Sequence, residues 1–114
     1  MNAPDKDWEK IMEFFRRRFT AGETPTLDTV LFLIGVRERQ QPPRRFSKDE
    51  KINLMHVGLC SLLSFTDYCR RTGSDPEGWP LFSQEKSLPQ DDREREKIIR
   101  EALIRYFRQN GLID

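Results

Sequence analysis

Apolar residues recur every three or four positions over much of this chain, which is the spacing of amphipathic helices. The first such stretch covers residues 5–20, and Gly22 follows it as a natural stop. Its apolar stripe consists of Trp8, Ile11, Met12, Phe15 and Phe19. The pattern predicts a helix with one buried face, while Phe14 lies off the stripe and is free to face a second surface.

Residues 24–39 are apolar on nearly every side, so we expect a second helix that is mostly buried. Thr24 and Pro25 have the residue types of an N-cap and of a first helical position. Gly35 costs about 1 kcal/mol relative to alanine inside a helix, and close contact with another helix would explain it. The two prolines of QQPPRR then end the helix.

A third helix is expected from residue 48 to residue 65, because Ser47 and Glu50 have the spacing of a capping box. Its expected buried face is Ile52, Met55, Leu59, Leu62 and Leu63, and Leu54, Val57 and Phe65 widen that face. This apolar helix is the predicted centre of the core. It also carries the chain's one histidine, His56, at its edge.

Residues 66–89 show no helical period, and their GSDPEG segment is rich in turn-forming residues. The flanking stretches DYCRR and GWPLFS have the character of two short strands, which favours a hairpin. Pro80 would then require an edge position, because proline cannot donate to a strand ladder. An irregular ordered loop remains the alternative.

A fourth helix is predicted for residues 91–109, with Asp91 and Glu94 at capping-box spacing and Gly111 after its end. Its buried stripe is Ile99, Ala102, Leu103, Tyr106 and Phe107. The expected fold is mainly α: a single domain over residues 1–114. Four helices pack around the third, with a short β-hairpin or ordered loop between the third and the fourth.

The charge balance and the cysteine content of the chain disfavour several classes of function. The chain has 20 basic and 19 acidic residues, so its net charge of +1 gives no field that would capture nucleic acid or an anionic membrane. Its start is polar and its longest apolar run is short, which predicts neither a signal peptide nor a membrane span. With two cysteines, we expect a soluble, cytoplasmic protein with free thiols.

His56 and Cys60 share a helix face, and Cys69 and Asp67 lie nearby in the sequence. Zinc sites use three or four ligands, usually at recognisable spacings that are missing here, so we expect no metal and no other cofactor. Hydrolytic triads need an activated nucleophile, and neither GxSxG nor a P-loop occurs. The sequence therefore indicates no catalytic residue and no enzyme.

The segment 66–89 is the best candidate for an interaction surface, because long ordered connections are often functional and aromatic residues and arginine dominate interfaces. The candidate interaction residues are Tyr68, Trp79, Phe82, Phe14, Arg44 and Arg45. A structural alternative is that Trp79 and Phe82 cap the helices. The leading hypothesis is a non-enzymatic protein-interaction module that binds another protein or itself as a homodimer. The second is an accessory protein that contacts nucleic acid through its arginine clusters.

Four segments resemble small uncharacterised bacterial proteins of the kind seen in Bacteroidetes. They are LDTVLFLIGVRE, FSKDEKINLMHVGLCSLLS, GWPLF and REALIRYF, which together extend from about residue 27 to residue 108. The resemblance implies a compact, helical bacterial domain. It implies no activity, no substrate and no catalytic residues.

Overall fold

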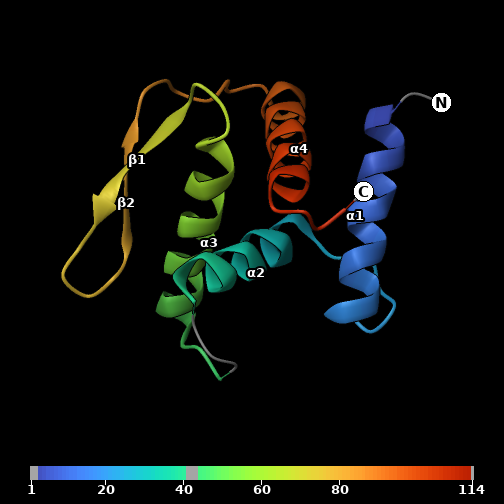
Figure 1. The fold of residues 1–114 in the computed structure, drawn as a ribbon, viewed down its shortest axis with the longest axis horizontal. Coiled ribbons are helices and arrows are strands. Elements are labelled where there is room, and N and C mark those ends of the chain that lie inside the picture. The colour runs from blue at the N-terminus through green and yellow to red at the C-terminus, as the bar shows by residue number, and fades with distance from the viewer. Residues whose placement is uncertain (1–2, 41–43, 114) are drawn as a thin grey trace. The chain divides into compact units, whose positions relative to one another are not determined.

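The computed structural model describes residues 3–40 and 44–113. Its elements in chain order are α1 (Ala3–Arg18), α2 (Leu27–Arg39), α3 (Lys48–Leu63), β1 (Cys69–Ser74), β2 (Pro80–Gln84) and α4 (Asp92–Gln109), as Figure 1 shows. The prediction of a mainly α chain with four helices is confirmed, and the hairpin is present between α3 and α4. The prolines expected to end α2, Pro42 and Pro43, lie outside the described residues.

The chain divides into two compact units. Residues 1–26 and 89–114 form the two-helix unit, which holds α1 and α4. Residues 27–88 form the hairpin unit, which holds α2, α3 and both strands. Packing of α2 and the hairpin against α3 occurs within the hairpin unit. The packing of α1 and α4 around α3 stays a prediction.

The two-helix unit is held by an aromatic cluster and one ion pair. Phe107 of α4 packs edge-on against Phe14 of α1, with ring centroids 5.1 Å apart. Arg108 donates to the carboxylate of Asp7, which is only 5% exposed. All five residues of the predicted α4 stripe are buried. Phe19, expected in the α1 stripe, is instead 55% exposed, because α1 ends at Arg18 and the chain turns away.

Helices α2 and α3 meet at two glycines. A Cβ atom on Gly35 would lie 1.8 Å from the carbonyl oxygen of Leu54, and one on Gly58 would lie 2.0 Å from the carbonyl oxygen of Leu31. Any side chain larger than hydrogen would therefore push the two backbones apart. The expected close contact at Gly35 is confirmed, and Gly58 is its counterpart on α3.

The predicted buried face of α3 is confirmed only in part. Leu62 and Leu63 are buried, and so are Leu54 and Val57, which were expected to widen that face. Ile52 is 54% exposed, and Met55 and Leu59 are only partly buried. The buried residues are Leu54, Val57, Gly58, Cys60, Ser61, Leu62 and Leu63. The α2 backbone lies directly against α3 at Gly58, so the buried part of α3 includes this glycine, which a hydrophobic pattern does not mark.

The helix starts differ in how well they were predicted. Ser47 accepts a hydrogen bond from the Glu50 amide, and the Glu50 side chain accepts one from the Ser47 amide, so the capping box of α3 is confirmed. Asp91 is the N-cap of α4. The predicted start of α2 at Thr24 and Pro25 is wrong, because α2 begins at Leu27. The hydroxyl of Thr24 instead accepts hydrogen bonds from Arg16.

The hairpin pairs β1 and β2 antiparallel, with Cys69 opposite Gln84 and Arg71 opposite Phe82. The register shifts between Arg71 and Gly73, which indicates a bulge. Pro80 is the first residue of β2, in a sheet of two strands where every strand is an edge, so its predicted edge position is confirmed. Among the described residues, no helix has the length and apolar composition needed to cross a membrane.

Candidate functional site between α3 and the hairpin

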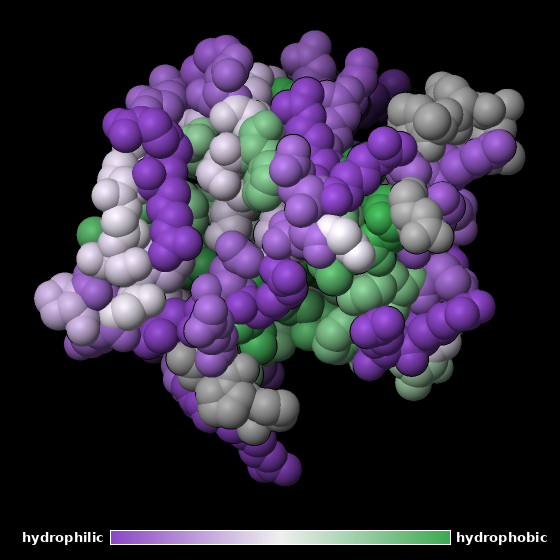
Figure 2. Space-filling model, viewed as in Figure 1, coloured by the Kyte–Doolittle hydropathy of each residue, from purple (hydrophilic) through white to green (hydrophobic). Residues whose placement is uncertain are grey.

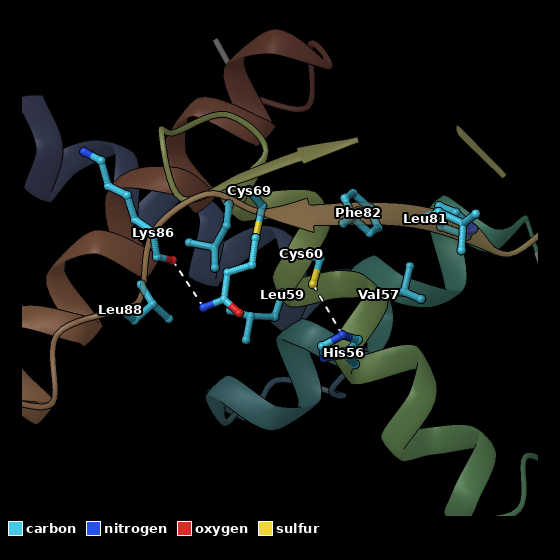
Figure 3. Close-up of a pocket in the computed structure, with 12 residues that line it drawn as sticks. His56, Val57, Leu59, Cys60, Cys69, Leu81, Phe82, Lys86 and Leu88 are labelled. Atoms are coloured by element: carbon cyan, nitrogen blue, oxygen red, sulfur yellow. Dashed lines mark hydrogen bonds between the residues drawn. The ribbon is translucent and has the colours of Figure 1, made fainter. Parts of the chain in front are cut away.

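A pocket of about 440 Å³ lies in the hairpin unit, between α3 and the hairpin. Figure 3 shows its lining. Helix α3 contributes one wall, which includes His56 and Leu63, and β2 contributes another, which includes Phe82 and Gln84. Strand β1 contributes only Cys69, so the pocket lies on the β2 side of the hairpin. Its size and its mixture of apolar walls with a few polar groups are typical of ligand pockets.

The ladder geometry shows which backbone groups border the pocket. The amide of Glu85 donates to the carbonyl of Tyr68, so this pair is hydrogen-bonded. Hydrogen-bonded and non-hydrogen-bonded pairs alternate in antiparallel strands. The pairs Cys69–Gln84 and Arg71–Phe82 are therefore non-hydrogen-bonded, and their N–H and C=O groups point away from the partner strand. On β2 these groups belong to two residues whose side chains line the pocket.

The same face of the hairpin carries the side chains of the pocket. Pro80, Phe82 and Gln84 alternate along β2 and share one face with Cys69, opposite Gln84. Cys69 and Pro80 on this face are buried, whereas Arg71 and Gln84, which alternate with them on the same face, are exposed. The hairpin thus packs over α3, and the outer edge of β2 is a free edge of the hairpin.

Two thiols and one imidazole lie together in the pocket. The Sγ atom of Cys60 is 3.6 Å from Nε2 of His56, one helical turn away, and Cys69 faces Cys60 from the start of β1 (Figure 3). Both cysteines are free and buried. Burial raises the pKa of Cys60 to about 11, and the neighbouring Cys69 thiol contributes to this rise. Burial also raises the pKa of Cys69, while a hydrogen bond with Cys60 lowers it.

The structure brings Cys60 and Cys69 to His56 but leaves Asp67 outside. The Asp67 carboxylate is 85% exposed and lies 3.5 Å from the ammonium group of Lys86. Among residues 3–40 and 44–113 no group of three or more metal-ligating side chains has a geometry that could hold an ion. The arrangement therefore offers two thiols and a neighbouring base, and it offers no metal centre in the described part of the chain.

Three of the predicted interaction residues, Tyr68, Trp79 and Phe82, are spread along the hairpin. Tyr68 lies opposite Glu85 where the hairpin leaves α3, and Trp79 lies at the turn. The six steps from Trp79 to Glu85 span about 20 Å at the rise of a β-strand. Phe82 lies between them and lines the pocket. Of the predicted residues, Phe82 is the one that belongs to the site.

Trp79 anchors the turn of the hairpin. The guanidinium group of Arg39, at the end of α2, lies 4.7 Å from the Trp79 ring centroid and donates to the carbonyl of Glu77. Asp75 accepts hydrogen bonds from the Trp79 and Glu77 amides within the turn. Trp79 is therefore half-buried against α2, as expected for the structural role that the sequence left open.

Two of the predicted arginines of the hairpin unit, Arg44 and Arg70, form ion pairs with glutamates. Arg44 forms an ion pair with Glu50 at 2.5 Å and lies over the Phe46 ring. Arg70 forms an ion pair with Glu85 at 2.8 Å. Arg45 is exposed. Hydrophilic residues are spread widely over the face in Figure 2. Within the described residues, Glu50 and Glu85 offset the charges of Arg44 and Arg70.

Phe14 belongs to the two-helix unit and is only partly exposed, because it contacts Phe15, Phe19 and Phe107 and lies under Arg18. Its side chain therefore serves the packing of that unit.

The chain matches no protein-family model, no curated protein and no solved structure.

Sequence reasoning missed three lining residues of the pocket: Gln84, Lys86 and Leu88. Their polar or isolated positions in residues 66–89 gave no periodic signal. A hairpin register would have placed Gln84 on the face of Cys69, but that register depends on the bulge near Gly73. No local rule fixes the position of that bulge.

Proposed function

We propose that this chain is a non-enzymatic protein-interaction module. It binds an extended segment of a partner protein, which adds to the outer edge of β2 as a third strand. One apolar side chain of the segment, of the size of leucine or phenylalanine, fills the pocket between α3 and the hairpin. The observation that carries this proposal is the position of the pocket along an edge strand whose outward amides belong to its own lining residues.

The backbone of β2 supports strand addition. Within the described residues the sheet has two strands, so nothing in it pairs with the outer edge of β2. The outward N–H and C=O groups of Phe82 and Gln84 offer up to four main-chain hydrogen bonds. In strand addition such bonds supply affinity, and pockets for alternate side chains supply specificity.

The pocket supports an apolar anchor. Leu59, Leu63 and Phe82 provide apolar walls, and His56 and Lys86 provide polar groups at the opening. An anchoring side chain buried in such a pocket contributes about 1.5–3 kcal/mol by the hydrophobic effect alone. Combined with main-chain bonds, one anchor suits a specific but reversible interaction.

The charge pattern disfavours nucleic acid as the partner. Arginines of three clusters form ion pairs with glutamates of this chain, and Arg16 and Arg17 both contact Glu13. A phosphate backbone would have to displace these carboxylates at each contact, which weakens counterion-driven binding. No observation in the described residues favours an enzymatic function over binding.

The proposal is tested by selecting binders from a displayed library of short random peptides and measuring their affinity for two proline variants. Gln84→Pro removes an outward N–H from β2, and Arg71→Pro removes the matching outward N–H from β1. Proline is tolerated where the strand N–H faces away from its partner. We expect selected peptides with an apolar anchor whose affinity falls at least about tenfold in Gln84→Pro and stays unchanged in Arg71→Pro.

Three controls test the role of the Gln84 side chain, the fold of the variants and the identity of the bound segment. Gln84→Ala keeps the backbone N–H and should retain binding. This variant distinguishes loss of the main-chain hydrogen bond from loss of the Gln84 side chain. Circular dichroism should show the same fold for all variants. Sedimentation equilibrium should show a monomer, and a dimer lost only in Gln84→Pro would identify a second copy as the occupant. Equal effects of both prolines, or no enriched peptide, would contradict the proposal.

A further inference from the structure

The two cysteines of the pocket come from elements that the fold brings together. Cys60 lies in the last turns of α3, and Cys69 is the first residue of β1. Helix α3 and β1 pack against each other, and both thiols line the same pocket. Figure 3 shows their sulfur atoms on neighbouring walls, with His56 on the side of Cys60.

The thiols of this pair differ in their surroundings. Cys69 gains a hydrogen bond with Cys60 that lowers its pKa, whereas the charge of a Cys69 thiolate raises the pKa of Cys60. Burial raises the pKa of both thiols. The charge of Glu85 also raises the pKa of Cys69, and the hydrogen bond with Cys60 is the one contribution that favours its thiolate, so the first attack is assigned to Cys69. The imidazole of His56, 3.6 Å from the Cys60 sulfur, can accept the proton of the second thiol.

We propose that Cys60 and Cys69 form a reversible dithiol–disulfide pair, which is oxidised by small organic disulfides that enter the pocket. The pocket volume of about 440 Å³ admits such a molecule. The inference does not depend on the proposed strand addition, because it concerns only the thiols and the access that the pocket gives to them.

The reaction proceeds in two thiol–disulfide exchanges. The Cys69 thiolate attacks one sulfur of the small disulfide, the S–S bond breaks, and one thiolate leaves and takes up a proton. Cys60 then loses its proton to His56 and attacks the Cys69 sulfur of the mixed disulfide. The Cys60–Cys69 bond forms and the second small thiol leaves, taking the proton from His56. Two protein thiols are oxidised, and one disulfide is reduced to two thiols.

Oxidation changes the site in a defined way. The new bond ties the end of α3 to the start of β1 and closes residues 61–68 into a loop. It also replaces two thiol groups in the pocket wall by a bond that cannot donate hydrogen bonds. Because both thiols are buried and have raised pKa values, exchange is slow at neutral pH compared with an exposed thiol.

The experiment incubates the reduced full-length protein with 2-hydroxyethyl disulfide and follows its intact mass and its unreduced peptide map. The wild-type chain should lose two hydrogen atoms and yield one cross-linked peptide pair that contains Cys60 and Cys69. Cys60→Ser should accumulate a mixed disulfide on Cys69, because the second thiol is missing. Cys69→Ser should show little adduct in the same time, because the first attacking thiolate is missing.

Two further variants test the role of the imidazole. His56→Gln should prolong the lifetime of the mixed disulfide without changing its rate of formation. Asn53→Ala, an exposed change on the same helix, should alter neither step. Circular dichroism checks that each variant is folded, and alanine at either cysteine replaces a serine variant that is not.

The folded structure should favour the cross-link. The equilibrium constant for its formation should be at least about tenfold higher in the native chain than in the same chain in urea, because the fold holds the thiols together. An equal constant in both states, an unchanged wild-type mass, or adducts that accumulate on Cys60 instead of Cys69 would overturn the proposal.

Discussion

The crossing of α2 and α3 at Gly35 gives the sharpest prediction about stability. Replacing Gly35 by alanine places a Cβ atom 1.8 Å from the Leu54 carbonyl oxygen, where ordinary contact begins at 3.4 Å. The clashing atom belongs to the backbone, so no change of rotamer can relieve it. The helices would have to separate by roughly 1.6 Å, which would loosen the contacts on both sides of the crossing.

The sign of the change in unfolding free energy distinguishes a backbone clash from the effect of helix propensity alone. At an exposed helical position, glycine to alanine would stabilise the chain by about 1 kcal/mol. Overpacking costs about 1–3 kcal/mol and occasionally more, and a backbone clash belongs at the upper end. We therefore expect Gly35→Ala to lower the free energy of unfolding by about 2 kcal/mol or more. Urea unfolding followed by circular dichroism measures this directly.

Two variants complete the comparison. Gly58→Ala meets the Leu31 carbonyl oxygen at 2.0 Å and should destabilise by a similar amount. Asn53→Ala, exposed on α3, should change the free energy of unfolding by less than about 0.5 kcal/mol. The double glycine variant should cost less than the sum of both changes, because one separation relieves both clashes. A Gly35→Ala protein as stable as wild type, or more stable, would refute the close crossing.

Further predictions concern caps, ion pairs and thiols. Ser47→Ala should lower the free energy of unfolding by about 1 kcal/mol, measured in urea, because it removes the N-cap of α3. Arg108→Ala should lower it by about 2 kcal/mol, because the buried Asp7 carboxylate loses its cation. Hydrogen bonding to an arginine lowers the pKa of Glu50 from 4.5 to about 2, so its contribution to stability is complete above pH 4.5 and is lost as the pH falls toward 2. Glu50→Gln should remove that pH dependence, measured as the stability difference from wild type between about pH 2 and pH 5. Iodoacetamide should alkylate Cys60 more slowly in the folded chain than in urea at the same pH, because its pKa of about 11 leaves little thiolate.

Local sequence signals predicted the elements well. The capping box at Ser47 fixed the start of α3, and the period of α4 identified all five of its buried stripe residues. The GSDPEG turn and the strand-like flanks predicted the hairpin. These features depend on neighbours within a few residues, so a single sequence contains them.

Features that depend on distant contacts were harder to predict. The buried face of α3 was predicted only in part, because glycine and cysteine carry little weight in a hydrophobic pattern, yet Gly58 is where α2 packs. The start of α2 was misjudged because the Thr24 hydroxyl contacts Arg16, eight residues away, instead of capping a helix. Such long-range partners leave no trace in local propensity.

The candidate site was only partly predictable, for the same reason. His56, Cys60 and Cys69 were recognised as neighbours, and the structure brings them together. Tyr68 and Trp79 were expected on one surface, but the hairpin places them at its opposite ends. The pocket arises only when the register of β2 sets Phe82 and Gln84 above α3, and a bulge contributes to that register.

The central claim is that the outer edge of β2 is a binding edge, and amide hydrogen exchange measured by NMR tests it most directly. With a library-selected peptide bound, the amides of Phe82 and Gln84 should become protected. Those of Cys69 and Arg71, on the opposite edge of the same hairpin, should exchange as in the free protein. Protection on β1 alone, or unchanged exchange at Phe82 and Gln84 in a saturated complex, would contradict the claim.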